Sequence, residues 1–195
     1  MDALQGYDLG MLEFFGSLHR PWLDVLVMTW THLGDFVFLA PLTLLMVLAF
    51  AAAGRRRAAL TLAAVAVASF VVQYGVKGLV DRPRPAVAWR LIALPNEPSF
   101  PSGHALSPTA IYLTAALLLA RELRRRWMRV ALVAAGVFLG LTIGLTRPYL
   151  GVHYPLDMLA GWTAGLGLAF AGVWLAERDQ RRTDADPPTG SMTGA

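Results

Sequence analysis

Residues 57–80 read RAALTLAAVAVASFVVQYGVKGLV, an apolar run long enough to cross a lipid bilayer as one helix. No charged side chain lies between Arg57 and Lys77. Similar runs cover residues 105–120, 127–146 and 154–176, and a slightly shorter, uncharged run covers 36–53. Of the 195 residues, 56% are hydrophobic and 15% are charged, against about 25% charged in an ordinary soluble domain. The sequence therefore predicts an all-α integral membrane bundle and excludes a soluble globule.

The N-terminal region adds a shorter run at residues 21–33, which contains Asp24. Counting it as a span gives six transmembrane helices, and omitting it gives five. Residues 7–18 mix apolar side chains with carboxylates, which predicts a helix lying in the membrane interface. The first residues lack a basic stretch, so we expect no cleaved signal peptide. We expect one transmembrane domain over residues 1–178 and a disordered cytoplasmic tail over 179–195.

Most of the lysines and arginines fall in three clusters, at residues 55–57, 121–129 and 178–182. If the spans alternate in direction, all three clusters lie on one side of the membrane, and the positive-inside rule predicts that this side is cytoplasmic. The loops at 81–103 and 147–153 then face outside. The cations are too few and too close to helix ends for a nucleic-acid groove, so we expect no nucleic-acid partner.

Small residues are spaced four apart in the last two apolar runs. Gly136, Gly140 and Gly144 form one stripe, and Gly161 and Gly165 form another. Such stripes let helix backbones approach closely. We interpret both as internal packing faces in preference to a dimer contact.

Three further cations lie on the side where the positive-inside rule disfavours them. Lys77, Arg84 and Arg147 each stand at the outer end of a span or in an outer loop. Ser102 and Gly103 immediately precede an apolar helix, where free backbone N–H groups favour an anion. Each feature alone is ordinary, because a lysine can reach the interface and Pro-Ser-Gly is a common start of a helix. Together they predict a phosphate site.

Two histidines share this outer side with a carboxylate. His153 and Asp157 are four residues apart, so they face each other across one helical turn, and the carboxylate orients the imidazole. The alternative is a capping histidine with an aspartate that compensates the helix dipole. His104 follows Gly103 directly. A metal site is disfavoured, since two histidines and one aspartate among several cations make a poor cation cage, and cysteine is absent.

The spacing of these residues resembles the three signature motifs of the type-2 phosphatidic acid phosphatase family. The three segments are Lys77–six residues–Arg84-Pro85, Pro101-Ser102-Gly103-His104, and Arg147–five residues–His153–three residues–Asp157. They occur in order, between residues 77 and 157. One departure is Thr146, because the family usually has serine before the arginine of the third motif.

The resemblance implies a role for each motif residue. His153 attacks phosphorus and forms a phosphohistidine, Asp157 orients His153, and His104 protonates the leaving oxygen and then activates water. The phosphoryl oxygens are held by Lys77, Arg84, Ser102, Gly103 and Arg147. The resemblance implies no metal and no cofactor. Side-chain cations then neutralise the charge that Mg²⁺ neutralises in other phosphoryl transfers.

A site at the outer boundary between membrane and water favours a substrate whose phosphate is carried on a lipid. We expect membrane lipids as the other partners. By resemblance we expect a lipid phosphatase of the cytoplasmic membrane, with undecaprenyl diphosphate as the leading substrate. Phosphatidylglycerol phosphate, phosphatidate and lipid A phosphates stay open, as does transfer of the phosphate to an alcohol. A transporter or phosphate-lipid-binding protein is the non-enzymatic alternative, which would not require both histidines. The sequence indicates no oligomeric state.

Overall fold

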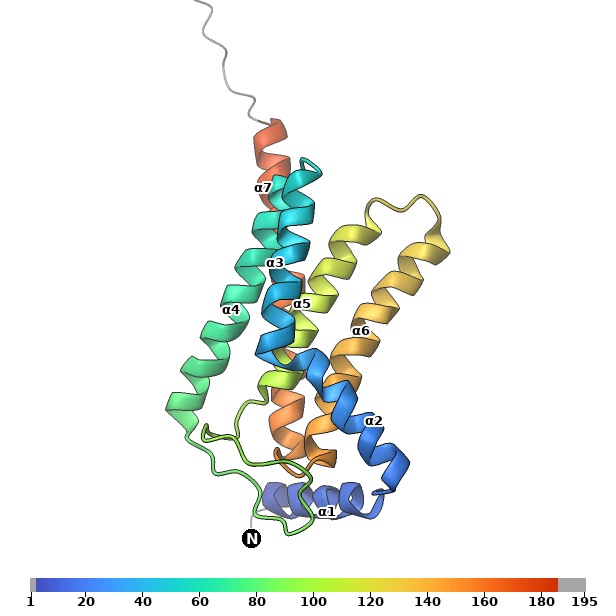
Figure 1. Cartoon of the computed structure of the whole chain (residues 1–195). Coiled ribbons are helices and arrows are strands. Elements are labelled where there is room, and N and C mark those ends of the chain that lie inside the picture. The colour runs from blue at the N-terminus through green and yellow to red at the C-terminus, as the bar shows by residue number, and fades with distance from the viewer. Residues whose placement is uncertain (1–2, 186–195) are drawn as a thin grey trace, which may run out of the picture.

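The computed structural model describes residues 3–185, which contain seven α-helices, one 3-10 turn and no strand (Figure 1). The helices are α1 (Ala3–Ser17), α2 (Pro21–Thr31), α3 (Phe36–Ala52), α4 (Arg56–Val80), α5 (Gly103–Ala120), α6 (Arg126–Tyr149) and α7 (Pro155–Ala185), and the 3-10 turn is His32–Gly34. The expected all-α class is confirmed.

Helix α5 forms the centre of the bundle. Most of its residues are buried, whereas no more than a third are buried in the membrane-length stretches of α4, α6 and α7. The exposed side chains are largely apolar and include Leu60 and Val67 on α4 and Phe138 on α6. A soluble protein rarely exposes so much apolar surface, and a bilayer covers it without cost. The outer helices therefore present a lipid-facing surface, and α5 is shielded from lipid.

The glycine stripes let two helices approach α5 closely. A Cβ atom on Gly140 would lie 2.5 Å from Thr109 Oγ1, and one on Gly165 would lie 2.6 Å from the carbonyl oxygen of Leu106. Neither position tolerates a side chain, because real Cβ atoms do not come that close to other heavy atoms. Thr109 and Leu106 both belong to α5, so the prediction that these stripes are internal packing faces is confirmed.

The six expected spans are not confirmed by the structure, which supports four or five. Among residues 3–185, four helices are long and apolar enough to cross a membrane, namely α4 to α7, and α2 with α3 adds at most one more. Helix α2 has 11 residues. At about 1.5 Å per residue it reaches roughly half of a 30 Å hydrocarbon layer. It continues through the 3-10 turn into α3 with a bend of 48°, so the pair counts as at most one span, broken at the bend. The five-span alternative fits this arrangement.

Opposite ends of the bundle differ in chemistry. Helix α1, the segment 81–102 and the turn between α6 and α7 gather at the lower end of Figure 1. The three basic clusters gather at the other end, where Arg55 lies 2.9 Å from Glu122 and Arg121 pairs with Glu177. Helix α1 lies across the bundle end, as an interfacial helix would, and its place at a membrane surface stays a prediction.

Helix α7 continues to Ala185, past residue 179, where the tail was expected to begin. Residues 186–195 lie outside the described part, so a disordered tail stays a prediction there.

Candidate active site

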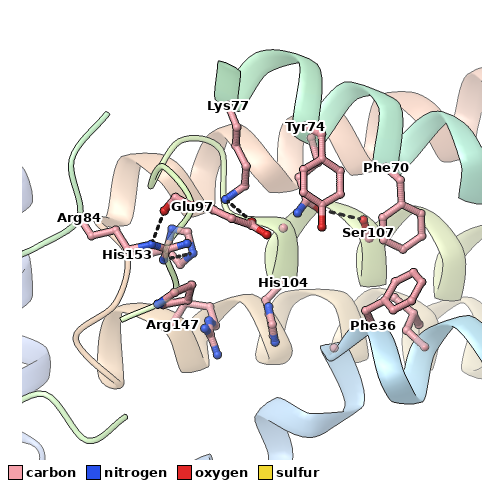
Figure 2. A pocket seen from close by; sticks show the side chains of 15 residues that line it. Phe36, Phe70, Tyr74, Lys77, Arg84, Glu97, His104, Ser107, Arg147 and His153 are labelled. Carbon is pink, nitrogen blue, oxygen red and sulfur yellow. Dashed lines mark hydrogen bonds and ion pairs between the residues drawn. The ribbon is translucent and has the colours of Figure 1, made fainter. Parts of the chain in front are cut away.

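Six of the eight residues expected at the site line one pocket of about 200 Å³ (Figure 2). They are Lys77 from α4, Arg84 from segment 81–102, Gly103 and His104 at the start of α5, Arg147 at the end of α6, and His153 in the α6–α7 turn. The other two, Ser102 and Asp157, are completely buried beside it. Residues up to 76 positions apart in the chain thus meet at one end of the bundle.

The segment 81–102 covers this pocket, and the cations hold it in place. Lys77 donates from Nζ to the carbonyl oxygen of Pro98 at 2.7 Å. Arg84 donates from Nε to the carbonyl oxygen of Glu97 at 2.7 Å and from Nη1 to that of Val152 at 2.8 Å. Two site cations therefore order the loop as well as charge the pocket.

The lone pair on Nε2 of the His153 imidazole points toward Arg84. Arg84 Nη1 lies 3.0 Å from Nε2 of His153, and a guanidinium can only donate, so Nε2 must accept. The ring proton then resides on Nδ1, which lies 3.5 Å from the carboxylate of Asp157. Burial lowers the pKa of His153 to about 3, and the guanidinium groups of Arg147 and Arg84 act in the same direction. His153 is therefore neutral at ordinary pH, as a nucleophile must be.

Three groups surround the completely buried carboxylate of Asp157 besides His153. Arg82 donates to Oδ1 at 2.5 Å, the backbone N–H of Tyr154 donates to Oδ2 at 3.0 Å, and the hydroxyl of Ser99 donates to Oδ2. Ser99 Oγ also lies 3.4 Å from His153 Nδ1. Ser99 thus stands between the carboxylate and the imidazole. The sequence analysis missed it, because a serine in a proline-rich loop has no distinguishing neighbour.

Helix α1 is tied to the site through Arg82, to which the sequence analysis gave no role. Its Nη2 lies 2.5 Å from Oδ2 of Asp8, a completely buried residue of α1. The other carboxylate oxygen of Asp8 accepts from the backbone N–H of Leu156 at 3.0 Å. One arginine therefore joins Asp8 to Asp157 and fixes the N-terminal helix against the first turn of α7.

His104 also has a carboxylate partner, which the sequence analysis missed. Its Nε2 lies 2.9 Å from Oδ1 of Asp35, in the break between α2 and α3. Oδ2 of Asp35 lies 2.6 Å from Nδ1 of His32. The sequence feature that could have indicated this partner is an aspartate just before the apolar run 36–53. An aspartate in that place is explained more simply as the N-cap of a helix.

Arg147 is buried, and Nη1 donates to the hydroxyl of Thr31 at 2.9 Å. Within residues 3–185, its Nε and the hydroxyl of Ser102 are buried polar atoms without a hydrogen-bond partner. Buried donors left unpaired are costly, so each of these two groups favours an acceptor beside it. Thr146 does not line the pocket. Its hydroxyl donates to Thr31 Oγ1 at 2.9 Å, so it supports Arg147 indirectly.

Gly103 lies close to a side chain of α4. A Cβ atom there would lie 2.5 Å from the side-chain amide of Gln73 on α4. Glu97 enters the same pocket, with Oε2 3.3 Å from Lys77 Nζ. Figure 2 shows Lys77, Glu97 and His153 at one end of the pocket and Phe36 and Phe70 at the other. One end of the pocket is therefore cationic and contains the carboxylate of Glu97, and the other end is apolar.

No group of three or more histidine, aspartate or glutamate side chains among residues 3–185 is arranged to hold a metal ion. The donor set of the pocket is dominated by cations, which favours an anionic ligand.

Comparison with known proteins places this geometry in context. The model of the PAP2 superfamily matches residues 57–181. Phosphatidylglycerophosphatase B of Bacillus subtilis is 28% identical over 182 residues, which is 92% of this chain and 88% of that protein. The undecaprenyl-diphosphatase of Sulfolobus acidocaldarius is 37% identical over 79 residues, 40% of this chain and 34% of that protein.

Among solved structures, a transmembrane PAP2-type phosphatidylglycerolphosphate phosphatase from Bacillus subtilis aligns with a TM-score of 0.84 and 27% sequence identity. The alignment covers 91% of this chain and 88% of that one.

Proposed function

This chain belongs to the PAP2 superfamily and is a membrane hydrolase of the lipid phosphatase family, and we propose that it works through a phosphohistidine at His153. The observation that supports this most directly is the placement of His153, with Nε2 toward Arg84 and Nδ1 toward Asp157, inside a pocket that also contains His104. A binding protein would need the cations of this pocket but not two differently held imidazoles.

In the first step, Nε2 of His153 attacks phosphorus while the bond from phosphorus to the lipid oxygen breaks. The protonated His104 gives its proton to the departing oxygen, and Asp157 stabilises the charge on the phosphorylated ring. In the second step, neutral His104 takes a proton from water, the water oxygen attacks phosphorus, and the P–N bond breaks. Inorganic phosphate leaves, and both histidines return to their starting states.

Charge neutralisation comes from the protein. Lys77, Arg84 and Arg147 surround the phosphate position with cations. Arg147 Nε and the hydroxyl of Ser102 have no hydrogen-bond partner among the described residues, so we expect both to donate to phosphoryl oxygens. Preorganised donors of this kind are usually the largest single contribution to catalysis of phosphoryl transfer. We therefore expect activity without added metal.

The apolar end of the pocket supports a lipid substrate. Phe36 of α3 and Tyr74 of α4 line the pocket and are 63% and 52% exposed, so the pocket opens sideways onto the lipid-facing surface. Phe36 and Phe70 pack edge to face at 5.4 Å beside this opening. A lipid can keep its chains in the bilayer while its phosphate reaches His153. A soluble phosphate ester would leave this apolar wall unused.

Phosphatidylglycerol phosphate is the first substrate candidate, because the sequence and structural similarity to a Bacillus subtilis phosphatase named for this lipid extends over most of this chain. Undecaprenyl diphosphate, the leading expectation from the sequence, is the second, supported by the shorter match to an undecaprenyl-diphosphatase. We place the site at the outer face of the cytoplasmic membrane, because the basic clusters lie at the opposite end of the bundle.

The test is phosphate release by the purified protein in detergent from a panel of lipid phosphates, with a chelator of divalent cations present. The panel contains phosphatidylglycerol phosphate, undecaprenyl diphosphate, phosphatidate and a soluble alkyl phosphate. We expect rapid release from at least one of the lipids, little from the soluble ester, and no loss on chelation. Release from the soluble ester alone would contradict the lipid assignment, and loss on chelation would contradict a metal-independent site.

A further inference from the structure

We propose that Asp35 is a positioning residue that keeps His104 in the state required for proton transfer in both steps. This inference rests on the proposed function. Asp35 Oδ1 lies 2.9 Å from Nε2 of His104, and the side chain of His104 is 19% exposed. The two residues are 69 positions apart in the chain, so the broken span brings them together.

The hydrogen bond determines which ring nitrogen faces the reaction. An ionised carboxylate only accepts hydrogen bonds, so Nε2 of His104 must carry its proton. Among the described residues, Nδ1 of His104 has no hydrogen-bond partner, and His104 lines the pocket. Nδ1 is therefore the nitrogen that exchanges a proton with the leaving oxygen and with water.

The charge of Asp35 matters as well as its position. The first step starts from the imidazolium form of His104, which is surrounded by the cations of Arg147 and Arg84 in the same pocket. A carboxylate at 2.9 Å offsets their repulsion and stabilises the imidazolium. Asp35 is itself held by His32, whose Nδ1 lies 2.6 Å from Oδ2. The site thus contains two imidazole–carboxylate pairs, one for the nucleophile and one for the acid.

The backbone beside Asp35 is fitted to the same ring. A Cβ atom on Gly34 would lie 2.8 Å from Cδ2 of His104 and 2.6 Å from Ile143 Cγ2. The break between α2 and α3 therefore contacts the imidazole along its edge while Asp35 bonds its end. This second contact is independent of the hydrogen bond and restricts rotation of the ring.

The experiment compares two leaving groups in Asp35→Asn. Asparagine preserves an acceptor at this place but removes the charge. For a lipid phosphate, whose alkoxide needs a proton, we expect kcat to fall about 10- to 100-fold with KM within about twofold. For an aryl phosphate that carries an alkyl chain, whose phenolate leaves without a proton, we expect the pre-steady-state burst to keep its rate within about threefold. The alkaline limb of the kcat profile should move to lower pH.

Asp24→Asn is the matched control, because Asp24 lies on the same broken span and bonds Tyr149 outside the pocket. We expect it to keep both activities. Rates are expressed per burst-active site, so misfolded protein does not count, and Asp35→Ser is the second variant if Asp35→Asn fails to fold. Equal losses on the two substrates, or kcat equal to that of Asp24→Asn, would overturn the inference.

These results are separable from failure of the proposed function. If His153→Ala stays active, the phosphohistidine mechanism fails. If His153→Ala and His104→Ala are inactive while Asp35→Asn is unaffected, only the role of Asp35 fails.

Discussion

Replacement of His153 by alanine is expected to lower kcat on the lipid substrate by about 10⁴-fold or more, because no other group can form the bond to phosphorus. Removal of a covalent nucleophile in a preorganised site typically has effects of this size. The measurement is the initial rate of phosphate release from protein that elutes as a single species in detergent.

His19→Ala provides a matched control. His19 lies at the same end of the bundle and bonds the carbonyl oxygen of Tyr149 at 3.0 Å, but it does not line the pocket. We expect its activity to stay within about fivefold of the original protein. Activity of His153→Ala comparable with that of this control would exclude His153 as the nucleophile.

Asp157→Asn is expected to lower kcat by about 10³- to 10⁴-fold with a smaller change in KM. The amide is close in shape to the carboxylate, but it no longer stabilises positive charge on the ring, and it favours the wrong tautomer of His153. It also faces Arg82, which donates to this position at 2.5 Å. The comparison requires kcat and KM from full saturation curves.

Two neighbours separate the orientation of His153 from general support of the fold. Ser99→Ala removes a hydroxyl that lies between Asp157 and His153, and we expect a loss of about tenfold. Asp8→Asn removes the other partner of Arg82 without touching His153, and we expect a smaller loss. If Asp8→Asn lowered kcat as much as Asp157→Asn does, the effect of Asp157 would come from its support of the fold and not from its contact with the imidazole.

The sequence was sufficient for the elements that depend on local pattern. Long apolar runs identify α4 to α7 because helix length must match bilayer thickness, and the glycine stripes identify the faces that pack on α5. The motif residues converge as expected because both outer loops return to the same end of the bundle.

The elements that sequence reasoning missed depend on long-range geometry. The run at residues 21–33 reads as a marginal span, but hydropathy carries no information about the bend that joins α2 to α3. Without that bend, nothing relates Asp35 to His104. In the same way, the contact between Asp8 and Arg82 depends on α1 lying across the end of the bundle.

The central claim is the covalent bond between phosphorus and His153, and trapping it is the most direct measurement. The His104→Ala variant, which lacks the group that activates water, is mixed with an alkyl-chain aryl phosphate labelled in its phosphate and stopped in alkaline detergent. The phenolate of this substrate leaves without a proton, so the first step does not need His104. Peptide mapping by mass spectrometry should place one phosphoryl group on His153, in proportion to the phenol released. Product release in that amount with no phosphoryl group on His153, or with the label on another residue, would contradict the mechanism.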